Sequence, residues 1–270
     1  MTKPLKVGLA GLGAIGRAMA RKLHDGALPD TTLAGVCARD YAKARAFMDE
    51  ISCPAPVLTV EALAQIADLV VECAPAAVFG EIAVAVLSEG KVFMALSVGQ
   101  LLERPELIAL AKEHGGQIIV PTGALIGLDA VTAAAEGEIQ SVSMITRKPV
   151  KGLLGAPYLA KHGIEIANIT APLRIFKGTA REAARGFPEN VNVVAALSLA
   201  GIGADKTTIE IWADPALTRN VHRVVVESDS ASFEMSIQNI PSENPKTGRI
   251  TALSALAALR KLRAPLRVGT

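Results

Sequence analysis

The sequence predicts an α/β protein with a doubly wound parallel sheet in its N-terminal half and a second, α+β domain with a mostly antiparallel sheet. Apolar runs alternate with helix-like stretches over residues 5–121, as parallel sheets require. After residue 122, apolar runs follow one another across short polar breaks, which is typical of antiparallel strands. The chain has 270 residues, enough for two modest domains, and only 3% are aromatic, so its cores must be largely aliphatic.

The expected elements of the first domain alternate regularly. Residues 5–10, LKVGLA, form a buried strand, and a helix over 14–24 follows because its apolar residues recur at helical spacing. Further strands are expected over 32–37, 68–73, 92–96 and 117–121, and further helices over 40–50 and about 76–89. Pro105 suits the start of another helix and Gly115-Gly116 its end. Strands that alternate with helices in this way pair in parallel.

The second domain is expected to contain four strands and two helices before a last helix. The strands are predicted within 141–148, 206–214, 221–228 and 231–239, and the helices within 179–187 and 190–200. A final helix over about 248–262 carries regularly spaced leucines. We therefore expect domains at 1–122 and 123–247, with the C-terminal segment 248–270 packing back on the first domain or across the junction.

Charge and cysteine content exclude several classes of protein. The net charge is +2 and no long basic run is present, so we expect no nucleic-acid partner. Three cysteines without metal-ligand spacing argue against a disulfide framework and against a metal site, and we expect Cys37 and Cys73 to be buried thiols. Since no signal-like stretch and no 18-residue apolar run is evident, we expect a cytoplasmic protein without a membrane partner.

A glycine-rich turn follows the first expected strand. Gly11, Gly13 and Gly16 match G-x-G-x-x-G, in which the first glycine permits the turn, the second admits a pyrophosphate and the third allows close helix–strand packing. Ala14 and Ile15 begin the next helix, whose N–H groups favour an anion. We therefore expect a Rossmann domain that binds NAD or NADP through these five residues, rather than a purely structural turn.

The end of the second strand bears on the choice of cofactor. A carboxylate at this point usually binds the ribose 2′-hydroxyl of NAD, but position 38 is alanine and Arg39 follows it. Arg39 suits the 2′-phosphate of NADP or stacking on the adenine. Asp40 either reaches the ribose or caps the next helix. We expect NADP to be accepted beside NAD.

Small residues follow the next two strands. Ala74, Pro75 and Ala76 come after the strand 68–73, and Ser97–Gly99 occupy the same place after the following strand. Because ligands of open α/β sheets lie beyond the carboxyl ends of the strands, Ala74–Ala76 are candidate neighbours of the adenosine or the nicotinamide ribose. Ordinary turns of small residues are the alternative.

One of four histidines stands out as a candidate acid or base. His24, His114 and His162 lie near helix ends or in a polar turn and are expected at the surface. His222 lies at the start of the apolar run VHRVVV, where it is either structural or catalytic. An imidazole suits proton transfer because its ordinary pKa is near neutrality.

Three further segments offer binding groups. Gly123 and Ala124 would let the backbone approach the nicotinamide where the chain leaves the first domain. Asn190 is either the N-cap of a helix or a ligand of the nicotinamide carboxamide. Thr247 is expected to cap the last helix, whose N-terminus also suits a substrate carboxylate.

Six motifs together resemble those of the L-aspartate dehydrogenases. They are GLGAIG, ECAP at 72–75, PTGALIGLDA at 121–130, FPENVNV at 187–193, DP…N.H within 214–222 and NPKTGRITALSALA at 244–257. The resemblance implies a Rossmann domain followed by a dimerisation domain, and a homodimer. It implies oxidation of L-aspartate with NAD or NADP, through iminoaspartate, to oxaloacetate and ammonia, or the reverse, and a link to NAD biosynthesis. It places His222 as the active-site histidine and Ala124 and Asn190 as cofactor contacts.

The substrate suggested by this resemblance requires cationic side chains for its two carboxylates. Lys148, Lys151, Arg219 and Lys246 are the candidates, with Lys148 and Thr247 taken as substrate-binding residues. We expect His222 to accept a proton from the substrate amine or from an ordered water, and then to assist the attack of water on the imine.

Three other functions compete with this one. A dihydrodipicolinate reductase-like enzyme shares the two-domain plan, but that family's adjacent histidine pair has no counterpart here. Homoserine dehydrogenase-like chemistry matches less well in length and motifs. A non-catalytic NAD(P)-sensing protein would keep the glycine turn without needing His222.

Overall fold

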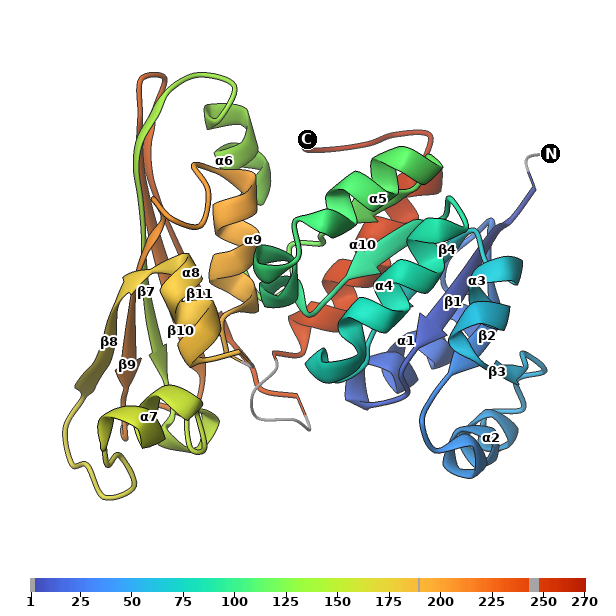
Figure 1. Ribbon diagram of the computed structural model, residues 1–270, viewed down its shortest axis with the longest axis horizontal. Helices are drawn as coiled ribbons and strands as arrows, with labels where there is room; N and C mark the ends of the chain where they lie inside the picture. The colour runs from blue at the N-terminus through green and yellow to red at the C-terminus, as the bar shows by residue number, and fades with distance from the viewer. Residues whose placement is uncertain (1–2, 189, 243–247) are drawn as a thin grey trace. The chain divides into compact units, whose positions relative to one another are not determined.

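The computed structural model describes residues 3–188, 190–242 and 248–270 (Figure 1). The chain divides into two compact units. The first comprises Met1–Pro121 and Ala252–Arg267, and the second comprises Thr122–Thr251 and Val268–Thr270. In the described part of the chain, no helix has the length and apolar character needed to cross a membrane.

A six-stranded parallel sheet forms the centre of the first unit, with the order β3-β2-β1-β4-β5-β6. Its strands are β1 (Leu5–Ala10), β2 (Thr31–Cys37), β3 (Val57–Leu58), β4 (Leu69–Glu72), β5 (Val92–Ala95) and β6 (Gln117–Ile119). From β1 the chain adds strands first on one side of the sheet (β2, β3) and then on the other (β4, β5, β6), so the strand order switches between β1 and β4. Nucleotides bind at such a switch point in doubly wound folds. The predicted Rossmann sheet is confirmed.

Helices cover both faces of this sheet. One face packs against α1 (Ala14–His24), α2 (Tyr41–Glu50) and α10 (Ile250–Arg263), which share an apolar core with β1. The other face packs against α3 (Val60–Ile66), α4 (Phe79–Ser88) and α5 (Glu106–His114). On that side, the Phe79 and Phe93 rings meet edge to face at 5.3 Å. Short 3₁₀ turns, η1 (Ala76–Val78) and η2 (Val98–Glu103), follow β4 and β5.

The second unit contains a five-stranded mixed sheet with the order β11-β10-β7-β9-β8. Its strands are β7 (Ile139–Lys148), β8 (Leu173–Thr179), β9 (Thr208–Ala213), β10 (Asn220–Ser228) and β11 (Ser232–Asn239). Only the β7–β9 pairing is parallel, so the sheet is mostly antiparallel, as predicted. The edge strand β8 was not predicted, because its sequence LRIFKGT lacks a regular alternation of apolar and polar residues.

One face of the second sheet is covered by helices. Figure 1 shows α6 (Leu128–Ala134), α8 (Ala180–Gly186) and α9 (Asn192–Ala200) along this face. A further helix, α7 (Pro157–His162), and a 3₁₀ turn, η3 (Val150–Gly152), follow β7. Burial alternates along β10, where Asn220, His222, Val224 and Val226 are buried, so the covered face carries polar groups at one end and apolar groups at the other.

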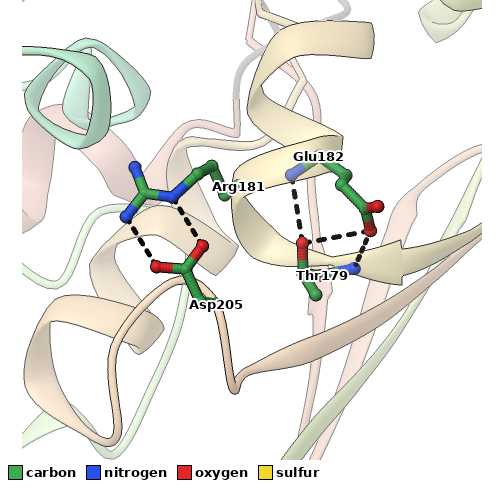
Figure 2. A network of polar contacts seen from close by, with 4 residues as sticks. All are labelled: Thr179, Arg181, Glu182 and Asp205. Atoms are coloured by element: carbon green, nitrogen blue, oxygen red, sulfur yellow. Dashed lines mark hydrogen bonds and ion pairs between the residues drawn. The ribbon is translucent and has the colours of Figure 1, made fainter.

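A capping box fixes the junction of β8 and α8 (Figure 2). Glu182 N donates to Thr179 Oγ1 at 3.2 Å, and Thr179 N donates to Glu182 Oε2 at 2.8 Å. The Arg181 guanidinium binds Asp205 through two hydrogen bonds of 2.6 and 2.9 Å. These contacts hold the start of α8, after which the chain continues into the segment that carries Asn190.

The burial predicted for two cysteines is wrong. Cys37 and Cys73 are only half-buried, whereas Cys53 is buried. Cys37 is the last residue of β2 and Cys73 follows β4, so both lie at the carboxyl edge of the sheet, where its cover is incomplete.

Candidate active site

The glycine turn of the first unit has the geometry that a dinucleotide requires. Gly11 adopts φ +108°, and a Cβ there would lie 2.5 Å from the Cys73 carbonyl oxygen, so only glycine fits. A Cβ on Gly16 would collide with the Gly11 carbonyl. A Cβ on Gly13, by contrast, would meet no atom of the described chain within 4 Å apart from its immediate neighbours, which leaves space for a phosphate.

The helix that follows presents its N-terminus to the same space. Gly13 is the N-cap of α1 and makes no side-chain cap, and the first turn, which begins with Ala14 and Ile15, carries no acidic residue. Its backbone N–H groups are therefore not capped by a side chain and suit an anion. The residues of this turn fit the pyrophosphate of a dinucleotide.

The other cofactor-binding candidates of the first unit lie on the same edge of its sheet. Arg39 is exposed just after β2. Asp40 caps α2, with Oδ1 accepting from Lys43 N at 2.9 Å, which confirms one of the two roles considered for it. After β4, Ala74 is half-buried, Pro75 is exposed and Ala76 begins η1.

In the second unit, His222 is deeply buried on the covered face of the sheet. Its side chain pairs with Thr146 of the neighbouring strand β7, and Thr146 Oγ1 lies 3.1 Å from His222 Nδ1. The two residues are 2% and 1% exposed, so water does not compete for this hydrogen bond. Since Nδ1 is engaged, Nε2 is the ring nitrogen that remains for a reacting group.

A buried lysine lies at the end of the same strand. Lys148 is 4% exposed, and its Nζ donates to the backbone oxygen and to Oδ1 of Asn190, each at 3.1 Å. The expectation that Asn190 caps the next helix is wrong, because α9 begins at Asn192 with Val191 as its N-cap. The side-chain oxygen that would have capped the helix accepts from the Lys148 ammonium instead.

Aromatic packing holds Asn190 in place. The Phe187 ring is fully buried, stacks on Tyr158 at 5.1 Å and meets Phe176 edge to face at 5.6 Å. Asn190 N donates to the Phe187 carbonyl at 2.8 Å. The apolar residues of FPENVNVV thus anchor the polar one.

A third polar group lies at this end of the sheet. Asn239 is 3% exposed, and its Nδ2 donates to the Ala124 carbonyl at 2.8 Å. Its Oδ1 has no hydrogen-bond partner within the described residues. Asn239 pairs with Asn220 on β10, two residues before His222, so its side chain is a diagonal neighbour of the imidazole on the same face. Neither Asn239 nor Thr146 was predicted from the sequence. The signal for both is a polar residue at a strand position whose side chain points to the buried face of the sheet.

Burial and charge control the protonation of this cluster. Burial of the imidazole, and then the positive charge of Lys148, lower the pKa of His222 from 6.5 to about 3. The imidazole is therefore neutral near neutral pH.

Two of the remaining candidates for the substrate carboxylates lie at the surface. Lys151 and Arg219, considered for the substrate carboxylates, are exposed. His24, His114 and His162 are also exposed, as predicted. The two other residues considered for the substrate, Lys246 and Thr247, lie outside the described residues.

Comparison with known proteins identifies the family. Residues 129–262 match the C-terminal domain of aspartate dehydrogenase, and residues 11–121 match the NAD-binding domain of homoserine dehydrogenase. An L-aspartate dehydrogenase from Bradyrhizobium diazoefficiens is 55% identical over 98% of this chain and 94% of its own length. The chain belongs to the L-aspartate dehydrogenase family. It is therefore an oxidoreductase that uses a nicotinamide cofactor.

Further relatives agree with this membership. L-aspartate dehydrogenase 3 from Bordetella bronchiseptica is 54% identical over 98% of both chains. The crystal structure of aspartate dehydrogenase from Thermotoga maritima superposes with a TM-score of 0.73, covering 98% of this chain and 99% of that one at 22% identity. That structure supports the fold, whereas the two sequence relatives support the family.

Proposed function

We propose that this protein is an NAD(P)-dependent L-aspartate dehydrogenase that converts L-aspartate, through iminoaspartate, to oxaloacetate and ammonia, or catalyses the reverse reaction. The observation that carries the proposal is the buried pair of His222 and Lys148 on one face of the second sheet, in a chain of this family. A neutral imidazole beside a buried cation suits a substrate that is both an amine and a dicarboxylate.

The first unit supplies the cofactor site in this proposal. The turn Gly11–Gly16 and the N-terminus of α1 hold the pyrophosphate, and Ala74–Ala76 lie along the nucleoside. Arg39 binds the 2′-phosphate when NADP is used. A nicotinamide held there would supply the acceptor for the hydride that leaves the α-carbon of the substrate.

Lys148 is the proposed ligand of a substrate carboxylate. Its Nζ donates to two oxygens of Asn190, both of them neutral amide or peptide oxygens. An anionic oxygen would form a charge-assisted hydrogen bond there, which is stronger than a neutral one. We also propose that Ala124 and Asn190 contact the nicotinamide, as the resemblance implies. Both residues lie in the same unit as Lys148.

His222 is the proposed acid and base. Through Nε2 it takes a proton from the amine or from an ordered water, so that the neutral amine can lose hydride from its carbon, and it later assists the attack of water on the imine. A carboxylate bound at Lys148 offsets the charge that lowers the His222 pKa, so substrate binding strengthens the base. Asn239 Oδ1 is an acceptor for the substrate amine.

The uncovered face of the second sheet suggests a homodimer. Ile145, Trp212, Val221 and Val225 alternate with charged residues there and are only half-buried. Such a face is suited to a second copy of the chain. Light scattering after size exclusion tests this proposal, and a monomer at micromolar concentration would contradict it. We further propose a cytoplasmic location and a role in supplying iminoaspartate to NAD biosynthesis.

The decisive experiment measures reduction of NAD and of NADP by L-aspartate at alkaline pH, with other amino acids in parallel. His222→Ala is expected to lower kcat about 10²–10⁴-fold, because general acid–base catalysis has that magnitude. Cofactor binding should be preserved, and His114→Ala, at an exposed histidine of α5, is the matched control. Full turnover by His222→Ala would remove its assignment as the base. Tight cofactor binding without turnover of any amino acid would favour an NAD(P)-sensing protein.

A further inference from the structure

Glu72 is a fully buried carboxylate at the carboxyl edge of the first sheet. It is the last residue of β4 and is 0% exposed. A buried carboxylate is costly unless hydrogen bonds replace its hydration. Burial raises the pKa of the Glu72 carboxyl above its ordinary value, and hydrogen bonds from Ser97, Ala74 and Leu96 offset part of that rise because they favour the ionised form.

Four donors from two separate loops compensate this burial. Oε1 accepts from Ala74 N at 3.0 Å and from Ser97 Oγ at 3.1 Å. Oε2 accepts from Leu96 N at 3.2 Å and from Ser97 N at 2.8 Å. Ala74 follows β4, and Leu96 and Ser97 follow β5, so a single carboxylate joins the loops of two adjacent strands.

The first of these loops packs directly against the glycine turn. The Cys73 carbonyl oxygen and Ala74 N lie 2.5 and 2.8 Å from the position that a Cβ on Gly11 would occupy. Cys73 N in turn donates to the Ala10 carbonyl at 2.7 Å. The peptide held by Glu72 is therefore the one on which the first glycine of the turn rests.

We propose that Glu72 is a positioning residue for the nicotinamide cofactor: its carboxylate fixes the loops after β4 and β5, and through them the glycine turn and the cofactor edge of the sheet. This proposal rests on the assignment of that turn to the cofactor. Glu72 acts through the backbone it holds and not by contact with the reacting atoms, so it is expected to govern cofactor affinity more than the chemical step.

Only an ionised carboxylate can accept hydrogen bonds from all four donors at this site. All four partners donate, and a carboxylate accepts at both oxygens. A glutamine of the same size would present its NH₂ group to at least one N–H donor, so one loop would lose its acceptor and must move.

The test compares Glu72→Gln with Glu113→Gln, a change of an exposed glutamate on α5 in the same unit. Titration with NADH and NADPH, followed by fluorescence, is expected to show cofactor affinity at least about tenfold weaker in Glu72→Gln, as loss of a buried charged hydrogen bond implies. The KM for cofactor should rise by a similar factor, while kcat at saturating cofactor falls much less. Folded Glu72→Gln with wild-type cofactor affinity would overturn the proposal.

Two further variants cover the case in which Glu72→Gln does not fold. Glu72→Asp keeps an acceptor-only carboxylate on a shorter side chain, and Ser97→Ala removes one donor and leaves the backbone bonds in place. Both are expected to fold and to bind cofactor more weakly, with the larger loss in Glu72→Asp. Wild-type affinity in both would refute the proposal. Because cofactor titration needs no amino acid, the result is independent of whether L-aspartate is the substrate.

Discussion

Thr146 and His222 face each other across neighbouring strands of the second sheet, with Thr146 Oγ1 3.1 Å from His222 Nδ1 and both side chains buried. Within the described residues this hydroxyl is the hydrogen-bond partner of the ring at Nδ1. It therefore orients the imidazole and leaves Nε2 as the ring nitrogen for the proton transfer that we propose.

Thr146→Val should lower kcat about fivefold or more, because the near-isosteric side chain removes the hydrogen bond, worth about 1 kcal/mol or more, and leaves the ring unoriented. Cofactor affinity should not change. Thr146→Ser retains the hydroxyl and is expected to restore most of the rate. Steady-state kinetics of the three proteins provide the measurement, and equal kcat values in the Val and Ser variants would argue that Thr146 only fills space.

Lys148→Met should raise the KM for L-aspartate by about tenfold or more, since the variant loses a charge-assisted hydrogen bond. Removing this positive charge should also raise the pKa of His222, which NMR titration of the imidazole can follow. Lys151→Met, a change of an exposed lysine just after β7, is the control. An unchanged KM would show that another cation holds the substrate.

Acid should destabilise the protein partly through His222. The folded state keeps the imidazole neutral down to a pH of about 3, whereas the unfolded chain takes up a proton near its ordinary pKa of 6.5. The unfolded state therefore binds more protons between these values, and stability falls as pH falls through this window. Urea unfolding at pH 7 and pH 5 should show a smaller loss of stability for His222→Gln than for the wild type or for His114→Gln, a change of an exposed histidine. The same loss in all three would contradict the prediction.

Arg39→Ala should lower kcat/KM for NADP by about tenfold or more while changing that for NAD only slightly, because only NADP carries the 2′-phosphate that an arginine binds. Initial rates with each cofactor give the ratio directly. An unchanged ratio, or no NADP turnover by the wild-type protein, would remove the proposed role of Arg39.

Local sequence was sufficient to predict most helices and strands of the first unit. The helix over 14–24 was predicted at its observed bounds, and Gly115 ends α5 in the left-handed conformation expected of a helix stop. The two-residue strand β3 and the helix α3 were not predicted, since elements so short carry too few apolar residues to reveal a period.

Residues close together in the chain were enough to predict the alternation of strands and helices, the glycine turn and His222 as the candidate base. The partners of the buried polar groups, by contrast, follow from the folded units alone. Thr146 and His222 are 76 positions apart, Lys148 and Asn190 are 42 apart, and Glu72 and Ser97 are 25 apart. Periodicity shows which face of a strand is buried, but strand order and register are set by packing of the whole unit, and they decide which buried polar groups meet.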